Sequence, residues 1–233
     1  MKRCILVSGS SSGIGRAITE LLLKSGYRVL GLGRDHDKFC LDDKNYSTFE
    51  VDFADLDSIT FKINNILKEN SDLYGVICNA GFGAFKNLES FSVKEIIENV
   101  NTNLIAHMIL VKAALPTLKK NKKGKIIFIG SEAALRGAKK GSLYNAVKFG
   151  LRGFAQAIRQ ESAPGNIHVT SINPGMVRTP FFDRVNFKPG LNPDNAISPV
   201  DVAQLVLTTL EIRTGTVIDE INLSPLKKVI RFE

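Results

Sequence analysis

Long apolar runs are absent from this chain of 233 residues, and none approaches the roughly 20 residues that a membrane-spanning helix needs. Cysteine is scarce, and Cys4, Cys40 and Cys78 show no metal-ligand spacing, so we expect buried reduced thiols rather than a metal site or a disulfide framework. Linkers rich in proline, glycine and serine, internal repeats and low-complexity segments are also missing. We therefore expect one domain over residues 1–233, with no membrane partner.

The first seven residues superficially resemble the start of a signal peptide, because Lys2 and Arg3 precede an apolar stretch. That stretch is too short for a signal peptide and runs directly into the Gly-rich residues 8–13. We interpret it as the first strand of the domain and expect a cytoplasmic protein.

The net charge of +8 suits an anionic ligand, although it also suits a nucleic acid. The basic residues are scattered except at 119–123 and 139–140. The first cluster closes a predicted long helix, where cations favour the C-terminal end of the helix dipole. No nucleic-acid motif accompanies either cluster, so we expect a small-molecule ligand and no nucleic-acid partner.

Short apolar runs alternate with segments of helical periodicity along the whole chain. Strands are predicted at residues 3–7, 28–32, 48–51, 73–78, 125–130, 168–172 and 217–222. Helices are predicted at residues 14–25, 55–69, 92–118, 143–162 and 199–211, several of them with capping signals. Near-continuous apolar character in most strands indicates burial on both faces, and the alternation predicts an α/β doubly wound parallel sheet.

A Gly-rich turn, Ser8-Gly-Ser-Ser-Ser-Gly-Ile-Gly15, lies between the first predicted strand and the first helix. Its glycines would allow a tight turn and the close approach of a pyrophosphate to the helix N-terminus. The spacing differs from the Gly-x-Gly-x-x-Gly fingerprint, and no Gly-Lys-Ser/Thr ending indicates a nucleoside triphosphatase. A flexible turn is the alternative, but the strand-to-helix context favours phosphate binding.

The end of the second strand indicates which dinucleotide would bind. An acidic residue at this place favours NAD, whereas here Gly33 is followed by Arg34, whose guanidinium can bind a 2′-phosphate. We therefore favour NADP over NAD, although an exposed arginine is an alternative and Asp35 would weaken the phosphate site if it turned inward. Asp52, at the end of the third strand, could accept from the adenine amino group or cap the next helix.

Tyr144 and Lys148 lie four residues apart on a predicted helix, which places both side chains on one face. A nearby ammonium favours the phenolate, and a tyrosine tuned in this way can exchange a proton near neutral pH. This spacing alone is common on solvated helix faces. Ser131, the Gly-rich turn and an Asn-Ala-Gly turn at 79–81 raise the pair above chance.

The order and spacing of these motifs resemble the single-domain branch of the short-chain dehydrogenase/reductase family over almost the whole chain. The motifs are the turn at 8–15, the turn at 78–81, Asn103, Ser131, Tyr144 with Lys148, and the segment 173–179. The resemblance implies a Rossmann-type sheet of seven parallel strands and hydride exchange between a nicotinamide and a small carbonyl or alcohol.

The resemblance also implies roles for individual residues. Tyr144 would be the general acid/base, Ser131 would bind the substrate oxygen, and Lys148 would hold the nicotinamide ribose and lower the pKa of the tyrosine. Asn103 would position a water in the proton relay, with Asn101 as the alternative. The implied cofactor contacts are Gly9, Ser11, Ser12, Gly13, Ile14, Gly15, Arg34, Asp52, Phe53, Asn79, Ala80, Gly81, Tyr144, Lys148, Pro174, Gly175, Val177 and Thr179.

Three positions depart from the pattern of the family. Ser8 replaces the usual threonine and keeps its hydroxyl, whereas Cys78 replaces an asparagine, so one hydrogen bond of the turn is expected to be absent. Ser12 stands where many NADP-preferring members carry a basic residue. Arg34 therefore remains the main indication of the 2′-phosphate.

The substrate is less well defined by the sequence. Candidate pocket residues follow the fourth, fifth and sixth strands, and they are Phe82, Phe85, Glu132, Arg136, Met176, Phe181 and Phe182. The irregular segment 174–197 is short for a deep lid, which favours a small or accessible carbonyl or alcohol. Arg136 and Lys139 suggest an anionic substrate such as a hydroxy acid.

Other functions and assemblies remain open at this stage. A catalytically silent NADP-binding sensor is the main alternative to an oxidoreductase, followed by a nucleic-acid-binding protein, and a sugar-nucleotide epimerase would normally need a larger C-terminal region. The family resemblance implies a homodimer or homotetramer paired through the helices 92–118 and 143–162. The tail 225–233 has spaced apolar residues that could pack on a neighbouring subunit.

Overall fold

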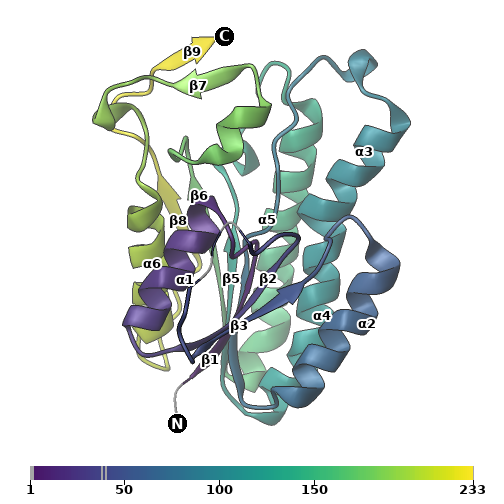
Figure 1. The fold of residues 1–233 in the computed structure, drawn as a ribbon, viewed down its shortest axis with the longest axis vertical. Coiled ribbons are helices and arrows are strands. Elements are labelled where there is room, and N and C mark those ends of the chain that lie inside the picture. The colour runs from purple at the N-terminus through teal and green to yellow at the C-terminus, as the bar shows by residue number, and fades with distance from the viewer. Residues whose placement is uncertain (1–2, 38, 40, 233) are drawn as a thin grey trace.

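The computed structural model describes residues 3–37, 39 and 41–232 and contains a sheet of seven parallel strands (Figure 1). The spatial order is β3-β2-β1-β4-β5-β6-β8. The bounds are β1 (Cys4–Ser8), β2 (Arg28–Gly33), β3 (Tyr46–Glu50), β4 (Leu73–Cys78), β5 (Gly124–Ile129), β6 (Ile167–Pro174) and β8 (Glu220–Leu223). The predicted doubly wound fold is confirmed. The strand order reverses beside β1, where the carboxyl ends of the strands open a crevice for a ligand.

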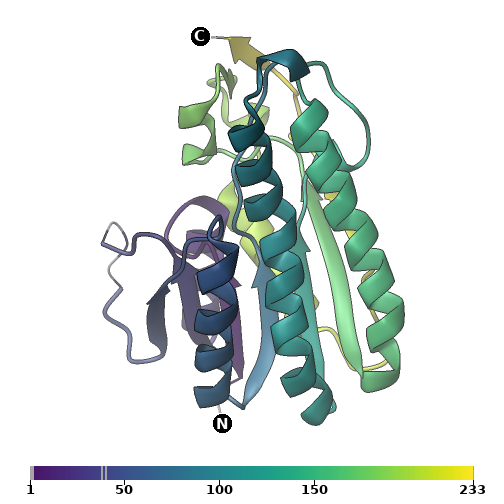
Figure 2. The same cartoon turned by 90° about the vertical axis from the view of Figure 1, so that its right-hand side faces the viewer.

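Helices cover both faces of the sheet (Figures 1 and 2). The bounds are α1 (Gly13–Lys24), α2 (Leu56–Glu69), α3 (Val93–Val100), α4 (Ala106–Lys120), α5 (Ser142–Ser162) and α6 (Pro199–Glu211). The helices α2, α4 and α5 pack on one face, and α1 and α6 pack on the other. None of the helices among the described residues is long and apolar enough to cross a membrane.

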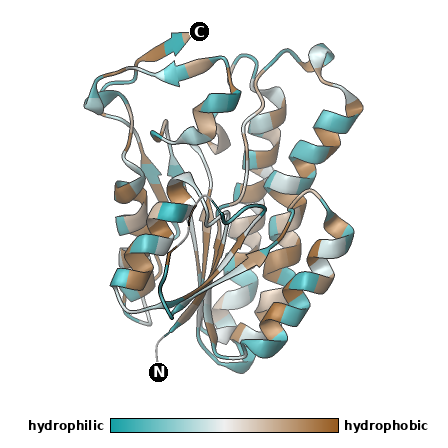
Figure 3. Ribbon diagram, in the orientation of Figure 1, coloured by the Kyte–Doolittle hydropathy of each residue, from teal (hydrophilic) through white to brown (hydrophobic). Residues whose placement is uncertain are grey.

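The central strand β1 shows why the strands are apolar on both faces. Cys4 and Leu6 belong to the core under α2, α4 and α5, whereas Ile5 and Val7 belong to the core under α1 and α6. Figure 3 shows the same pattern as hydrophobic strands between helices with one hydrophobic side. Full burial of each large apolar side chain contributes roughly 1.5–3 kcal/mol, so both layers stabilise the sheet that positions the site.

Two of the cysteines are buried free thiols. Cys4 lies in β1 and Cys78 ends β4, and burial raises the pKa of both side chains. Cys40 lies outside the described residues. Among the residues that the structure describes, no group of three or more His, Cys, Asp or Glu side chains could hold a metal ion.

The predicted continuous helix 92–118 is wrong in one respect, because it is broken into α3 and α4 by a π-helical turn at Asn101–Ile105. Ser92 and Glu95 form the predicted capping box at its start. Inside the π turn, the Asn103 side chain donates a hydrogen bond of 3.1 Å to the Asn99 carbonyl. A side chain that bonds the carbonyl four residues earlier competes with the helical ladder, and such turns often occur at functional sites.

The segment after β6 is more ordered than the sequence suggests. It contains a 3₁₀ turn (Pro180–Arg184) and a short strand β7 (Phe187–Pro189), which pairs antiparallel with β9 (Ile230–Phe232) near the C-terminus. The last predicted strand is also shorter than expected, because the strand predicted at 217–222 is observed as β8, which begins at Glu220 and ends at Leu223. The two-stranded sheet lies above the carboxyl edge of the main sheet (Figure 1).

Candidate active site

A single cavity of about 1010 Å³ follows the carboxyl ends of the strands from Arg34 to the C-terminal segment. Nearly every residue predicted for cofactor binding or catalysis lines it; the exception is Gly15. The cavity is large enough for a dinucleotide together with a small substrate, since ligand pockets commonly measure about 300–1,000 Å³. The residue set predicted from the sequence is therefore brought together in space.

The Gly-rich turn needs its glycines for two different reasons. Gly9 has φ +68° and Gly13 has φ +52°, a left-handed conformation that side chains other than hydrogen disfavour. At Gly15 the reason is space, because an added Cβ would overlap the Gly9 carbonyl oxygen. A Cβ at Gly13 would lie 3.3 Å from Cβ of Thr179, so the turn packs against the segment after β6. This bare main-chain cradle fits a pyrophosphate at the N-terminus of α1.

Ser8 ties the Gly-rich turn to the Asn-Ala-Gly turn after β4. Its hydroxyl accepts from the main-chain N–H groups of Asn79 (2.8 Å) and Ala80 (3.0 Å) and donates to the Ile77 carbonyl (3.2 Å). The Asn79 side chain returns a bond to the Ser8 carbonyl at 3.0 Å. A hydroxyl has one donor and two acceptor sites, so Ser8 is fully used. The serine therefore supplies all that this position requires of a threonine.

The end of the cavity beside β2 carries exposed charged side chains. Arg34 lines the cavity and forms no ion pair with any described residue. The carboxylate of Asp35 accepts the main-chain N–H of Asp37 at 3.0 Å. Asp52 also lines the cavity and accepts the N–H of Ala54 at 3.0 Å, whereas the cap of α2 is Asp55. The Arg34 guanidinium is thus available to an anion.

Asn103 lies on the cavity wall and holds the loop after β4. Its side chain accepts from the Phe82 N–H at 3.2 Å and donates to the Phe82 carbonyl at 3.1 Å. Asn101, the alternative from the sequence, does not line the cavity, and its side chain is 3.5 Å from the Ala54 carbonyl. Of the two asparagines, only Asn103 is placed where it could act.

Four residues after Asn103, at the start of α4, His107 supports the same loop. Its Nε2 lies 2.7 Å from the Ala80 carbonyl, and because a carbonyl only accepts, Nε2 carries the proton. Burial lowers the pKa of this imidazole to about 4, and the charge of Lys148 adds to the lowering. His107 is fully buried and neutral, and no motif in the sequence pointed to it.

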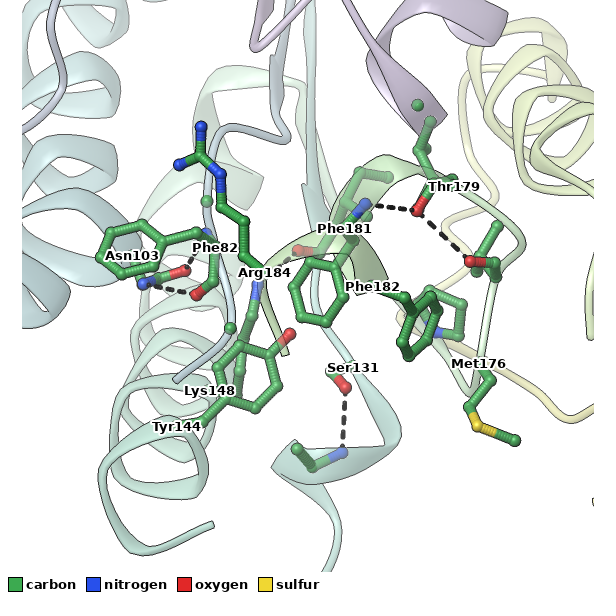
Figure 4. Close-up of a pocket in the computed structure, with 18 of the residues that line it drawn as sticks. Phe82, Asn103, Ser131, Tyr144, Lys148, Met176, Thr179, Phe181, Phe182 and Arg184 are labelled. Carbon is green, nitrogen blue, oxygen red and sulfur yellow. Dashed lines mark hydrogen bonds between the residues drawn. The ribbon is translucent and has the colours of Figure 1, made fainter. Parts of the chain in front are cut away.

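Ser131, Tyr144 and Lys148 meet at the centre of the cavity (Figure 4). Ser131 follows β5, and its hydroxyl accepts the Ala133 N–H at 3.2 Å. Tyr144 and Lys148 lie on α5, with the lysine Nζ 5.7 Å from the centroid of the tyrosine ring and 3.2 Å from the Ile129 carbonyl. The phenol, the primary hydroxyl and the amine thus line one cavity, with the two α5 residues on the same face of the helix.

The protonation of this group differs from the expectation that Lys148 lowers the pKa of the tyrosine. Burial raises the pKa of Tyr144 to about 12, and a hydrogen bond with the Ser131 side chain only partly offsets it. Burial also lowers the pKa of Lys148 to about 8, because the residue is only 4% exposed and the ammonium loses hydration. Tyr144 is therefore protonated at neutral pH and can donate a proton.

Aromatic rings pack against the ring of Tyr144. The Phe85 ring lies 5.0 Å and the Phe181 ring 6.0 Å from the tyrosine ring, measured between centroids. Phe187 lies 5.0 Å from Phe85, and Phe182 lies 5.3 Å from Phe181. All the predicted pocket residues line the cavity, which are Phe82, Phe85, Glu132, Arg136, Met176, Phe181 and Phe182.

The C-terminal segment forms part of the same wall, which the sequence did not reveal. The strand β9 pairs with β7, and Lys228 forms an ion pair of 2.5 Å with Glu132, next to Ser131. Lys228, Ile230 and Phe232 line the cavity, as do Arg184 and Phe187. Although β9 pairs with β7 of the same chain, Leu226 and Phe232 stay exposed, so packing of the tail on a neighbouring subunit stays a prediction. In the sequence, the spaced apolar residues of the tail were the only indication that it packs against another surface.

The fold and this site define a class of protein, and comparison with known families agrees. A family model described as short chain dehydrogenase matches residues 3–189. The chain belongs to the short-chain dehydrogenase/reductase family and is an enzyme of that class, as the sequence motifs predicted.

Individual relatives give a finer comparison. The chain is 33% identical to a 3-oxoacyl-(acyl-carrier-protein) reductase of Buchnera aphidicola over 79% of this chain and 78% of that protein. It is 31% identical to a 3-ketodihydrosphingosine reductase of Bacteroides thetaiotaomicron over 83% of this chain and 72% of that protein. An alcohol dehydrogenase of the archaeon Thermococcus sibiricus, solved with 5-hydroxy-NADP, superimposes with a TM-score of 0.88 at 25% identity over 98% of this chain and 99% of that chain.

Proposed function

We propose that this chain is an NADP-dependent reductase that transfers a hydride between the nicotinamide and a small carbonyl or alcohol substrate. One observation carries the proposal: the hydroxyls of Tyr144 and Ser131 and the amine of Lys148 share a cavity with a glycine cradle that fits a dinucleotide. The two relatives named as reductases of keto or oxo compounds support the same chemistry.

In this proposal the bound nicotinamide would supply the hydride to the carbonyl carbon. Ser131 donates a hydrogen bond to the substrate oxygen and polarises the carbonyl. Tyr144 gives its phenolic proton to that oxygen as negative charge develops there. The raised pKa of Tyr144 suits this direction, because the phenol holds its proton at neutral pH until the substrate oxygen becomes basic.

Lys148 and Asn103 complete the proposed catalytic set. Lys148 lies within the cavity one helical turn from Tyr144, where its Nζ could hold the hydroxyls of the nicotinamide ribose. Asn103 lies beside the π turn, and its place on the wall suits a residue that positions a water for the proton relay. The cofactor contacts proposed from the sequence are retained, with Gly15 acting through the shape of the turn.

NADP rather than NAD is proposed because of Arg34. Its guanidinium has no ion-pair partner among the described residues, and it lines the cavity at the end of β2. A 2′-phosphate would provide that partner through charge-assisted hydrogen bonds. The archaeal alcohol dehydrogenase solved with 5-hydroxy-NADP supports the assignment by analogy.

The setting of the enzyme is also part of the proposal. One domain is proposed for residues 1–233, because the two core layers share a single sheet. A homodimer or homotetramer is proposed, since α3 and α5 expose the apolar side chains of Ile97 and Phe149. A cytoplasmic location is proposed from the buried free thiols of Cys4 and Cys78.

The test is the consumption of NADPH and of NADH against a panel of small ketones, aldehydes and keto acids. We expect turnover with NADPH, and weaker turnover with NADH. Tight NADPH binding without turnover of any carbonyl would instead indicate a catalytically silent sensor. Retention on DNA at physiological salt without NADPH binding would indicate a nucleic-acid-binding protein.

A further inference from the structure

The substrate end of the cavity joins two kinds of surface. Next to Tyr144 the wall is aromatic, formed by Phe85 and Phe181 with Phe187 behind them. Figure 4 shows the Phe181 ring beside the tyrosine ring, with Ser131 on the same side of the hollow. The Phe85 and Phe181 rings meet edge to face at 6.5 Å, so together they form a continuous aromatic wall against which another flat group can pack.

Further out, the wall is cationic. Arg136, Lys139, Lys140 and Arg184 line the cavity, and none of them forms an ion pair with a described residue. Two carboxylates line the same end, those of Glu98 and Glu132, and Glu132 is already paired with Lys228. The outer wall therefore carries an excess of positive charge that the chain itself does not neutralise, and it would attract an anion.

The position of this cationic loop is fixed from the catalytic helix. Asn145 follows Tyr144, is 7% exposed, and donates from its side-chain amide to the carbonyls of Ala133 (2.7 Å) and Arg136 (2.8 Å). Its side-chain oxygen accepts from the Ala138 N–H at 3.2 Å. Three hydrogen bonds from one buried side chain hold the loop that bears Arg136 at a fixed place relative to Tyr144.

We propose that the substrate carries an aromatic or flat unsaturated group on its carbonyl carbon and an anionic group, a carboxylate or a phosphate, at its far end. This inference rests on the proposed reductase function. The flat group would pack against the wall formed by Phe85 and Phe181, and the anion would bind Arg136 and Lys139. In the reaction the carbonyl carbon gains the hydride from NADPH and the oxygen gains the proton of Tyr144, while the ring and the anion are unchanged and NADP⁺ is released.

The experiment compares matched aldehydes with NADPH as the reductant. The probes are 4-(carboxymethoxy)benzaldehyde, its methyl ester and 4-formylphenyl phosphate, with an aliphatic aldehyde acid as the non-aromatic comparison. In the wild-type enzyme we expect kcat/KM for both anionic aromatic aldehydes to exceed that for the ester by about tenfold or more. The aliphatic acid should be weaker than the aromatic acid. A higher kcat/KM for only one of the two anionic aldehydes would show whether the loop prefers a carboxylate or a phosphate.

Two double variants distinguish an effect of the cations in the cavity wall from an effect of the net charge of the protein. The double variant Arg136→Gln, Lys139→Gln should lose most of the advantage of the anionic aldehydes through KM while leaving the ester unchanged. The matched control Lys120→Gln, Lys123→Gln removes two cations outside the cavity and should change neither. Raising the salt to about 0.5 M should reduce the advantage in the wild type only, since ions screen exposed charges.

The outcomes distinguish this inference from the proposed function. An ester reduced as well as the acid, or an advantage that survives the double variant, would overturn the inference and leave the reductase in place. Turnover of other carbonyls but none of the aromatic aldehydes would do the same. If no carbonyl of any kind consumes NADPH, both the inference and the proposed function are wrong.

Discussion

At the proposed cofactor end of the cavity, β1 is joined to β2 by main-chain hydrogen bonds and to the turn after β4 by the side chains of Ser8 and Asn79. At the proposed substrate end, aromatic side chains and the C-terminal strand β9 form the wall. The Gly9 N–H bonds the Leu32 carbonyl at 2.7 Å, within the frame of the sheet. Phe187, in contrast, reaches Phe85 and Phe232 from segments far apart in the sequence. One end is fixed by the fold, and the other is assembled from peripheral segments that can vary without disturbing it.

Tyr144 lies between these two ends of the cavity. It lies on α5 and packs against the rings of Phe85 and Phe181, whereas the Gly-rich turn belongs to the connection between β1 and α1. Chemistry and cofactor affinity should therefore be separable by mutation. The predictions below test that separation.

The largest effect is expected for Tyr144→Phe. Removing the phenolic proton should lower kcat by about 10²–10⁴-fold, the usual contribution of positioned proton transfer. NADPH affinity, measured by the fluorescence of the bound cofactor, should change by less than about twofold, because the cofactor end is intact. Near wild-type turnover would remove Tyr144 from the mechanism.

The next effect concerns His107, which supports the loop shared by both ends. Its pKa is lowered from 6.5 to about 4, so the folded state favours the neutral ring and the unfolded chain takes up a proton first as the pH falls. This stabilisation is complete above the unfolded pKa and is lost as the pH falls towards the folded value. Between about pH 7 and pH 4.5 the loss should be about 2–3 kcal/mol of the free energy of unfolding.

Urea unfolding followed by circular dichroism at the two pH values measures this loss. The variant His107→Gln keeps a donor for the Ala80 carbonyl but cannot titrate. Other groups with shifted pKa values, such as His168, are common to both proteins and cancel in the difference. Parallel pH dependences for the wild type and the variant would contradict the assignment.

Gly15→Ala should weaken NADPH binding without changing the proposed substrate end of the cavity. The added Cβ would overlap the Gly9 carbonyl oxygen, and overpacking costs about 1–3 kcal/mol, which predicts NADPH binding weaker by about 10- to 100-fold. The control Gly153→Ala adds a methyl group on α5 where no atom lies within 4 Å. Equal NADPH affinity in both variants would show that the tight turn is not part of the cofactor site.

The smallest effect is expected for Arg34→Gln. Loss of one exposed charge-assisted contact to the 2′-phosphate should raise KM for NADPH by about tenfold and leave KM for NADH unchanged. Lys24→Gln, an equal charge change at the end of α1, serves as the control. If KM rises equally for NADPH and NADH, Arg34 does not bind the 2′-phosphate.

The same comparison explains what could be predicted from the sequence. The strands, the Gly-rich turn and the place of Tyr144 follow from local patterns, because adjacent residues carry both the apolar signal and the turn chemistry. The π turn at Asn101–Ile105 and the support from His107 depend on contacts with the loop at Ala80 and Phe82, which no local pattern encodes.

The part of the cavity wall formed by β7 and β9 could not be predicted from the sequence for a similar reason. β7 and β9 are three residues long and pair across more than forty positions, so neither has a periodicity to detect. The raised pKa of Tyr144 was also missed, because the helical spacing shows the neighbouring lysine but not the burial that raises this pKa. The parts that failed are those that depend on tertiary packing.

The most direct test of the account is the fate of deuterium carried on C4 of the nicotinamide of NADPH, in the face that the enzyme uses. We predict that the alcohol formed from an aldehyde substrate carries one deuterium on the former carbonyl carbon. The same label should be recovered, far more slowly, with Tyr144→Phe. Products without deuterium from either face of the labelled cofactor would contradict hydride transfer and with it the assignment of the site.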